Sequence, residues 1–178
     1  TFSSTGCIQL QDAIFWAFLD ISLGKVTTLA NNHLSTFSAN SLSIDGQSGA
    51  ELSMGIGSNT VNITKDLSLS SNARADISGT LLVGGKTDLS GGSILDLNVM
   101  GENRSTLGSV TISGTASELN LHGSSQSISA ISMNIGDGGH LQLDQVQLVL
   151  NSGTGSMNLI GNREDDVQNY ASLVTFTN

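Results

Sequence analysis

The sequence predicts an all-β protein whose short strands wind into a single-stranded parallel β-helix, here called a solenoid. Three observations lead to this fold class. Apolar residues alternate with polar ones over short stretches, these stretches recur about every 23 residues, and turns rich in glycine, asparagine and aspartate separate them. Alternation with a period of two turns one set of side chains inward and the next outward. Stacked repeats can therefore bury a core that no single repeat could bury.

The repeat contains two alternating strands separated by a small polar turn. Its apolar pairs are Leu42/Ile44 with Leu52/Met54, Leu67/Leu69 with Ala75/Ile77, Thr87/Leu89 with Leu95/Leu97, Val110/Ile112 with Leu119/Leu121, and Met133/Ile135 with Leu141/Leu143. Residues one repeat apart should lie over one another. One such column is predicted to hold Leu69, Leu89, Ile112 and Ile135.

A third apolar pair follows in several repeats and indicates three strands per turn. The pairs are Val61/Ile63, Leu81/Val83 and Ile128/Ile131. The turns between strands contain Ser71-Asn72, Gly91-Gly92, Gly114-Thr115 and Gly136-Asp137-Gly138-Gly139. Glycine, asparagine and aspartate accept the left-handed backbone conformation that sharp corners require. A β-sandwich is the competing architecture, because short strands with serine- and glycine-rich turns suit it as well.

The two ends of the chain differ from the repeats. Ile14, Ala17, Phe18 and Ile21 fall at helical spacing, so we expect a helix over residues 11–23 that covers the first turn. The predicted organisation is an N-terminal segment at 1–33, solenoid repeats at 34–160, and a C-terminal cap or strand at 161–178. Thr1 is not an initiator residue and no basic stretch follows it, so we expect the chain to be either a mature product, from which a leader has been removed, or a truncated one.

Composition and charge limit the partners of the protein. The formal net charge of −9 argues against nucleic acid as a partner, because binding to phosphates needs clustered lysine and arginine. The apolar segment from Ile8 to Ile21 is interrupted by Asp12 and Asp20 and is shorter than the roughly 20 residues of a transmembrane helix. Cys7 is the single cysteine, which excludes an intrachain disulfide. We expect no cofactor and no metal.

Candidate catalytic residues come from the carboxylates, because acid hydrolysis needs two acids whose pKa values their surroundings separate. Asp20 and Asp12 are the acids set in apolar surroundings, and Asp20 is followed by Ile21 and Ser22. On a helix these two acids would lie about 12 Å apart, too far to share a proton. A structural role on the helix is the alternative. His122 and His140 lie on neighbouring repeats, where stacking is a way to bring them together.

The repeats resemble the passenger regions of bacterial autotransporters and related β-helical adhesins. The resemblance covers residues 34–160 and rests on stretches such as Val110-Thr-Ile-Ser-Gly-Thr-Ala-Ser-Glu-Leu119-Asn-Leu121. It implies an exported surface protein, adhesive or carrying a hydrolase. No functional residue of that group maps onto a matching motif here, and the chain lacks the membrane barrel of a full-length autotransporter.

Two functions are therefore expected, and the sequence leaves open whether the protein is an enzyme. The first is a secreted or cell-surface bacterial module that adheres to glycans or to host glycoproteins through its outer polar residues. The second is an extracellular hydrolase, an aspartic-type protease or a glycosidase, acting on mucin-like glycoprotein or polysaccharide, with Asp20 as one working acid. A third possibility is a segment of a longer solenoid whose function lies elsewhere.

Overall fold

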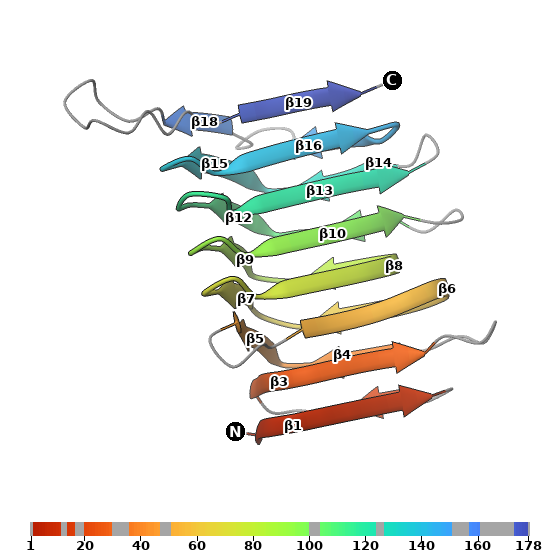
Figure 1. The fold of residues 1–178 in the computed structure, drawn as a ribbon. Helices are drawn as coiled ribbons and strands as arrows, with labels where there is room; N and C mark the ends of the chain where they lie inside the picture. The colour runs from red at the N-terminus through yellow and green to blue at the C-terminus, as the bar shows by residue number, and fades with distance from the viewer. Residues whose placement is uncertain are drawn as a thin grey trace.

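The computed structural model describes the backbone of residues 2–11, 14–16, 20–29, 36–46, 51–99, 104–123, 127–150, 157–160 and 173–177. These residues form a β-solenoid in which the chain climbs turn by turn from the N-terminal to the C-terminal end (Figure 1). After the first turn, each described strand lies beside the equivalent strand of the turn before it. The predicted solenoid is thus confirmed.

The described strands are short and follow one another closely. They are β1 (Phe2–Gln11), β2 (Ile14–Trp16), β3 (Asp20–Leu29), β4 (Thr36–Ala39), β5 (Ser41–Asp45), β6 (Glu51–Ile63), β7 (Leu67–Ser70), β8 (Arg74–Val83), β9 (Lys86–Leu89), β10 (Ile94–Val99), β11 (Ser105–Thr106), β12 (Ser109–Ile112), β13 (Glu118–Gly123), β14 (Ser127–Ala130), β15 (Ser132–Gly136), β16 (His140–Asp144), β17 (Gln147–Leu150), β18 (Met157–Ile160) and β19 (Leu173–Thr177).

The strands stack into three faces that share one core. The first face holds the start of β3 and then β5, β7, β9, β12, β15 and β18. The second face holds the rest of β3, the starts of β6 and β8, and then β10, β13, β16 and β19. The third face holds β2, β4, the ends of β6 and β8, and then β11, β14 and β17.

Every strand pairing given for the described residues is parallel, including that of β1 along β3. A β-sandwich is built from antiparallel strands joined by hairpins and Greek-key connections. The parallel pairing therefore decides against the alternative architecture. Strand β1 pairs with both halves of β3, so the same arrangement extends to the N-terminal end. The boundaries at residues 33 and 160 stay predictions.

The predicted core column exists. Leu69 lies opposite Leu89, Leu89 opposite Ile112, and Ile112 opposite Ile135 in successive pairings of the first face. All four side chains are fully buried. The alternating pattern of buried and part-exposed residues along β7, β10, β12 and β13 repeats this arrangement on two faces. The hydrophobic core thus runs along the axis of the solenoid.

The third strand of each turn departs from prediction at one residue. Ile128 is buried as expected, but Ile131 is 42% exposed. Ala130 fills the inward position that we assigned to Ile131. The reason is the period of a strand: residues 128 and 130 share a face, whereas Ile131 lies beyond the end of β14. The predicted pairs Val61/Ile63 and Leu81/Val83 are both buried.

Turn residues adopt the left-handed backbone conformation at the predicted corners. Asn72, Gly91, Gly114 and Asp137 all have positive φ. Gly108 also has a φ of +62°, and a Cβ on it would lie 1.9 Å from the carbonyl oxygen of Gly85. A side chain cannot be accommodated at that distance, so glycine is required where the chain turns from the third face to the first.

The N-terminal helix expected over residues 11–23 is not confirmed. The part of that segment that the structure describes is extended: Ile14–Trp16 is β2, and Asp20 begins β3. Pairing with β4 and β5 supplies these backbones with hydrogen-bond partners from the next turn. The β-branched and aromatic residues Ile14, Phe15 and Trp16 also favour strands. In the described residues, no helix has the length and apolarity needed to cross a membrane.

Candidate functional site

The outer surface of the second face carries the densest group of interacting charged and amide side chains among the described residues. Its position follows from the alternation along each strand: Ala75 and Ile77 are buried, so the residues beside them face outward. In the parallel register, Asp76, Asp96, Asn120 and Gln142 occupy equivalent positions on four successive strands. We call this outer surface, centred on these residues, the polar ladder.

Arg74 and two aspartates form the centre of the polar ladder. The Arg74 Nε donates to both carboxylate oxygens of Asp76, at 3.1 and 3.0 Å. Its terminal nitrogen also contacts Asp96. The Asn120 amide donates to Asp96 Oδ1 at 2.6 Å. One cation and one amide thus hold two carboxylates that lie directly opposite each other on neighbouring strands.

The surroundings of Asp96 and Arg74 shift the pKa values of both side chains. Partial burial raises the pKa of Asp96 because water is lost from around the charged form, and a hydrogen bond with Asp76 raises it further. Asn120 and the Arg74 guanidinium act in the opposite direction but do not cancel the rise. The pKa of Arg74 is raised, mainly by its hydrogen bond with Asp76. Asp96 therefore holds a proton more readily than an ordinary aspartate.

Two histidines flank the polar ladder, each beside an acid of the neighbouring strand. His122 Nδ1 lies 3.5 Å from Asp144 Oδ2, and His140 Nδ1 lies 3.9 Å from Glu118 Oε1. Glu118 is opposite His140 and His122 is opposite Asp144 in the register of β13 and β16. Four residues of strand separate the two histidines, about 13 Å. Stacking does not bring His122 and His140 together, because the register of β13 and β16 places them at opposite ends of the strand pair.

The chemistry available here is hydrogen bonding and charge pairing on a flat surface. Carboxylates accept, the guanidinium donates, and the amides do both. Within the described part of the chain no group of three or more histidine, cysteine, aspartate or glutamate side chains is placed to hold a metal ion. Asp76 and Asp96 are close enough to share a hydrogen bond between carboxyl groups, which is also the arrangement of an acid pair in hydrolysis.

The acids predicted from the sequence lie elsewhere. Asp20 is the first residue of β3, opposite Ser41, and belongs to the first face. Asp12 lies outside the described residues. The sequence argument missed Asp76 and Asp96, although a signal was present: each stands between the two apolar residues of the second strand in its repeat. Aligning the repeats on those apolar pairs would have placed both aspartates at one position.

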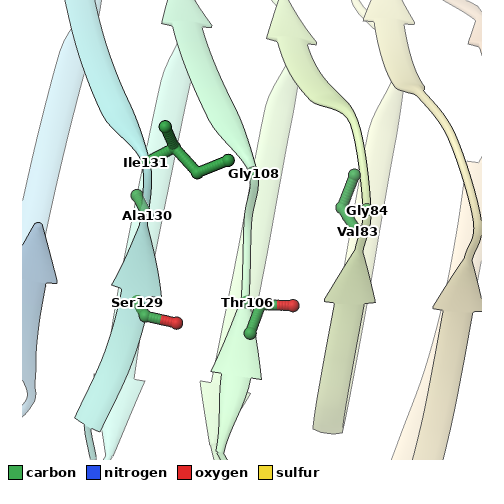
Figure 2. Close-up of a pocket in the computed structure, with 7 residues that line it drawn as sticks. All are labelled: Val83, Gly84, Thr106, Gly108, Ser129, Ala130 and Ile131. Atoms are coloured by element: carbon green, nitrogen blue, oxygen red, sulfur yellow. The ribbon is translucent and has the colours of Figure 1, made fainter. Parts of the chain in front are cut away.

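A small groove lies where the third face turns toward the first (Figure 2). Its volume is about 160 Å³, and it is lined by Val83, Gly84, Thr106, Gly108, Ser129, Ala130 and Ile131. The glycines leave the corner bare, and Figure 2 shows the Ile131 side chain extending toward Gly108. Ligand pockets usually enclose about 300–1,000 Å³. This groove is smaller than that, so the polar ladder is the better candidate site.

Comparison of the chain with protein-family models, curated proteins and solved structures finds no match.

Proposed function

We propose that this chain is a secreted or cell-surface β-solenoid module of a bacterium that adheres to glycans or host glycoproteins through the polar ladder. The observation that carries the proposal is the alignment of Asp76, Asp96, Asn120 and Gln142 on four successive parallel strands. The rigid stack repeats donors and acceptors at the strand spacing of about 4.8 Å. A carbohydrate chain likewise repeats its hydroxyl groups, each of which can donate and accept.

The internal contacts of the polar ladder support a binding role. Arg74 and Asn120 hold Asp96 in place before any ligand arrives, so little side-chain entropy would be lost on binding. The Asp96 side chain is 23% exposed and that of Asp76 is 35% exposed, so both remain accessible. Solenoids commonly bind ligands along such extended faces.

A glycan array probed with the full-length chain tests this proposal. We expect binding to a subset of glycans, and a loss of at least tenfold in affinity when Asp96 is replaced in Asp96→Ala. The matched control is Asp88→Ala, which removes an outward aspartate from β9 on the first face. Absence of binding to every glycan and to immobilised mucin would overturn the proposal, as would a loss of binding in Asp88→Ala but not in Asp96→Ala.

A hydrolase is the second candidate, and the facing carboxyl groups of Asp76 and Asp96 favour it. Hydrolysis by an acid pair uses one protonated and one ionised carboxyl group, and the raised pKa of Asp96 suits the protonated member. Incubation with mucin and with polysaccharides at acid pH, followed by analysis of the products, tests this function. Asp96→Asn should abolish cleavage. Cleavage that survives in Asp96→Asn but not in Asp20→Asn would move the function to the acid predicted from the sequence.

A further inference from the structure

Two histidine–carboxylate pairs lie at the two ends of the strand pair β13–β16, at the margin of the polar ladder. His122 Nδ1 is 3.5 Å from Asp144 Oδ2, and His140 Nδ1 is 3.9 Å from Glu118 Oε1. All four side chains are between 35% and 41% exposed, so solvent and ligands can reach them. The function proposed above does not use these pairs, although they border its ligand surface.

The polar ladder has an excess of negative charge while its histidines are neutral. Its strands β8, β10, β13 and β16 contain one arginine and four carboxylates, so their formal charge is −3. Arg74 contacts two of those carboxylates, Asp76 and Asp96. In the described register, no lysine or arginine lies opposite Glu118 or Asp144. A surface with this charge repels an anionic ligand.

The groups that face each histidine determine how protonation changes this charge. His122 lies between Asn98 of β10 and Asp144 of β16. His140 lies opposite Glu118 of β13, and strand β19 on its other side contains no ionisable residue. In the described register, the ionisable group opposite each histidine is thus one carboxylate. Each proton that a ring takes up therefore adds a positive charge that no facing cation opposes.

Mild acid changes the charge of the polar ladder in one direction. Histidine is the side chain whose charge ordinarily changes between about pH 8 and pH 5. Protonation of both rings brings the formal charge of the four strands from −3 to −1. Asp96 contributes in the same direction, because burial raises its pKa. Each protonated ring also donates from both nitrogens, so repulsion of anions falls as hydrogen-bond donors are gained.

We propose that the polar ladder excludes anionic glycans near neutral pH and admits them in mild acid, with His122 and His140 as the controlling groups. The inference rests on the proposed function, because it concerns ligand binding at the same surface. The ligand chemistry is a glycan with fixed negative charge, from the carboxylate of sialic acid or from sulfate. Neutral glycans carry no charge on which the change can act, so their binding should vary little with pH.

Binding of the full-length chain to mucin at about pH 7.5 and about pH 5.5, at one low ionic strength, tests the proposal. The matched ligand is the same mucin after removal of its sialic acids. We expect sialylated mucin to bind about fivefold or more tightly at the lower pH, the factor that one unit charge contributes at contact distance in water. Binding of desialylated mucin should change by less than about twofold.

Dextran sulfate beside uncharged dextran separates the two sources of negative charge. A rise in acid with dextran sulfate as well as with sialylated mucin assigns the recognition to negative charge in general. A rise with sialylated mucin alone assigns it to the carboxylate. In both cases high salt should reduce the rise, because it screens interactions between exposed charges.

Two double variants assign the effect to the histidines. His122→Gln combined with His140→Gln cannot take up the protons, so its binding of sialylated mucin should stay at the neutral level in acid. His122→Lys combined with His140→Lys carries the charges permanently, so at about pH 7.5 it should bind as the wild type does at about pH 5.5. The matched control, Thr111→Lys combined with Asn134→Lys, adds two charges to outward positions of the first face and should bind like the wild type. Circular dichroism should show all three folded.

The outcomes distinguish this inference from the proposed function. Binding of sialylated mucin that does not rise in acid overturns the inference alone, and so does a full rise in the folded glutamine variant. Equal gains at neutral pH from lysines on the two faces would also overturn it, because the net charge of the chain would then control binding. Absence of binding to every glycan at every pH overturns the proposed function and the inference with it.

Discussion

Asp96 lies directly opposite Asp76 in the parallel register of β10 on β8, and the single guanidinium of Arg74 contacts both carboxylates. Loss of water on burial and the neighbouring carboxyl group of Asp76 both oppose the ionisation of Asp96. Arg74 reduces that cost, but the raised pKa of Asp96 shows that a net penalty for its charged form remains. The charged form of Asp96 in the polar ladder therefore lowers the stability of the folded protein at neutral pH.

The first prediction concerns Asp96→Asn and pH. The pKa of Asp96 is higher in the folded protein, so in the window above the unfolded value of about 3.9 the folded state binds more protons. The contribution of Asp96 to stability is present below that window and is lost as pH rises through the folded pKa. Asparagine does not titrate, so the melting temperature of the variant minus that of the wild type should increase as pH rises from about 4 toward neutral.

Thermal unfolding at a series of pH values measures this difference. Asp88→Asn, on the first face, is the control variant for loss of an outward aspartate. A difference that shrinks as pH rises would show that Arg74 stabilises the ionised carboxylate more than burial penalises it.

The second prediction contrasts two buried threonines. Thr87 is fully buried, and its hydroxyl donates to the carbonyl of Leu107 at 2.7 Å. Thr87→Val should lower the free energy of unfolding by about 1–3 kcal/mol, because it removes that bond from a buried carbonyl. The buried Thr80 Oγ1 has no hydrogen-bond partner among the described atoms. Thr80→Val should therefore leave stability unchanged or raise it by up to about 1 kcal/mol.

Urea unfolding of both variants gives the comparison directly. Both substitutions replace a threonine hydroxyl by a methyl group. The difference between their effects on the free energy of unfolding therefore isolates the hydrogen bond of Thr87. Equal losses of stability in Thr87→Val and Thr80→Val would contradict the assignment of partners.

The third prediction concerns the two kinds of corner residue. Gly108→Ala should destabilise the protein by more than about 1 kcal/mol, because its φ is +62° and the new Cβ would meet the Gly85 carbonyl. Ala116 has a φ of 62° as well, although it carries a Cβ. Ala116→Gly should relieve strain and stabilise the fold by about 0.5–1 kcal/mol. Chemical unfolding of each variant checks these opposite signs, and a shift in the same direction for both would be inconsistent with the turn geometry.

The fourth prediction tests the core column. Ile112→Ala should cost about 2–5 kcal/mol, since Ile112 is fully buried between Leu89 and Ile135 and the removed atoms leave a cavity. Thr111→Ala, the neighbouring outward position on β12, should change the unfolding free energy by less than about 0.5 kcal/mol. Unfolding in urea distinguishes the two, and similar costs at both positions would mean that β12 does not alternate inward and outward.

The solenoid and its core could be predicted because aliphatic residues recur at equivalent positions, as Leu89 and Ile112 do. The acid pair was missed although the repeats carry its signal: Asp76 and Asp96 each stand between the two apolar residues of their strand, and the pairing of β8 with β10 makes them neighbours. Register also separates His122 from His140, which the spacing alone did not show.

The N-terminal segment shows the limit of periodicity. Ile14 and Ile21 stand at a spacing that a helix and the pair of strands β2 and β3 both allow. Pairing with the next turn, a contact between residues distant in sequence, decides between them. Ile131 was misplaced for a related reason: the chain leaves the strand at Ala130, and apolar character alone does not mark where a strand ends.

Methyl–methyl nuclear Overhauser effects in a leucine-, isoleucine- and valine-labelled sample test the stacking most directly. The column predicts cross-peaks linking Leu69 to Leu89, Leu89 to Ile112, and the δ1 methyl of Ile112 to that of Ile135. Absence of all these contacts, with Ile112 close instead to residues of a different repeat position, would contradict the solenoid and the surface built on it.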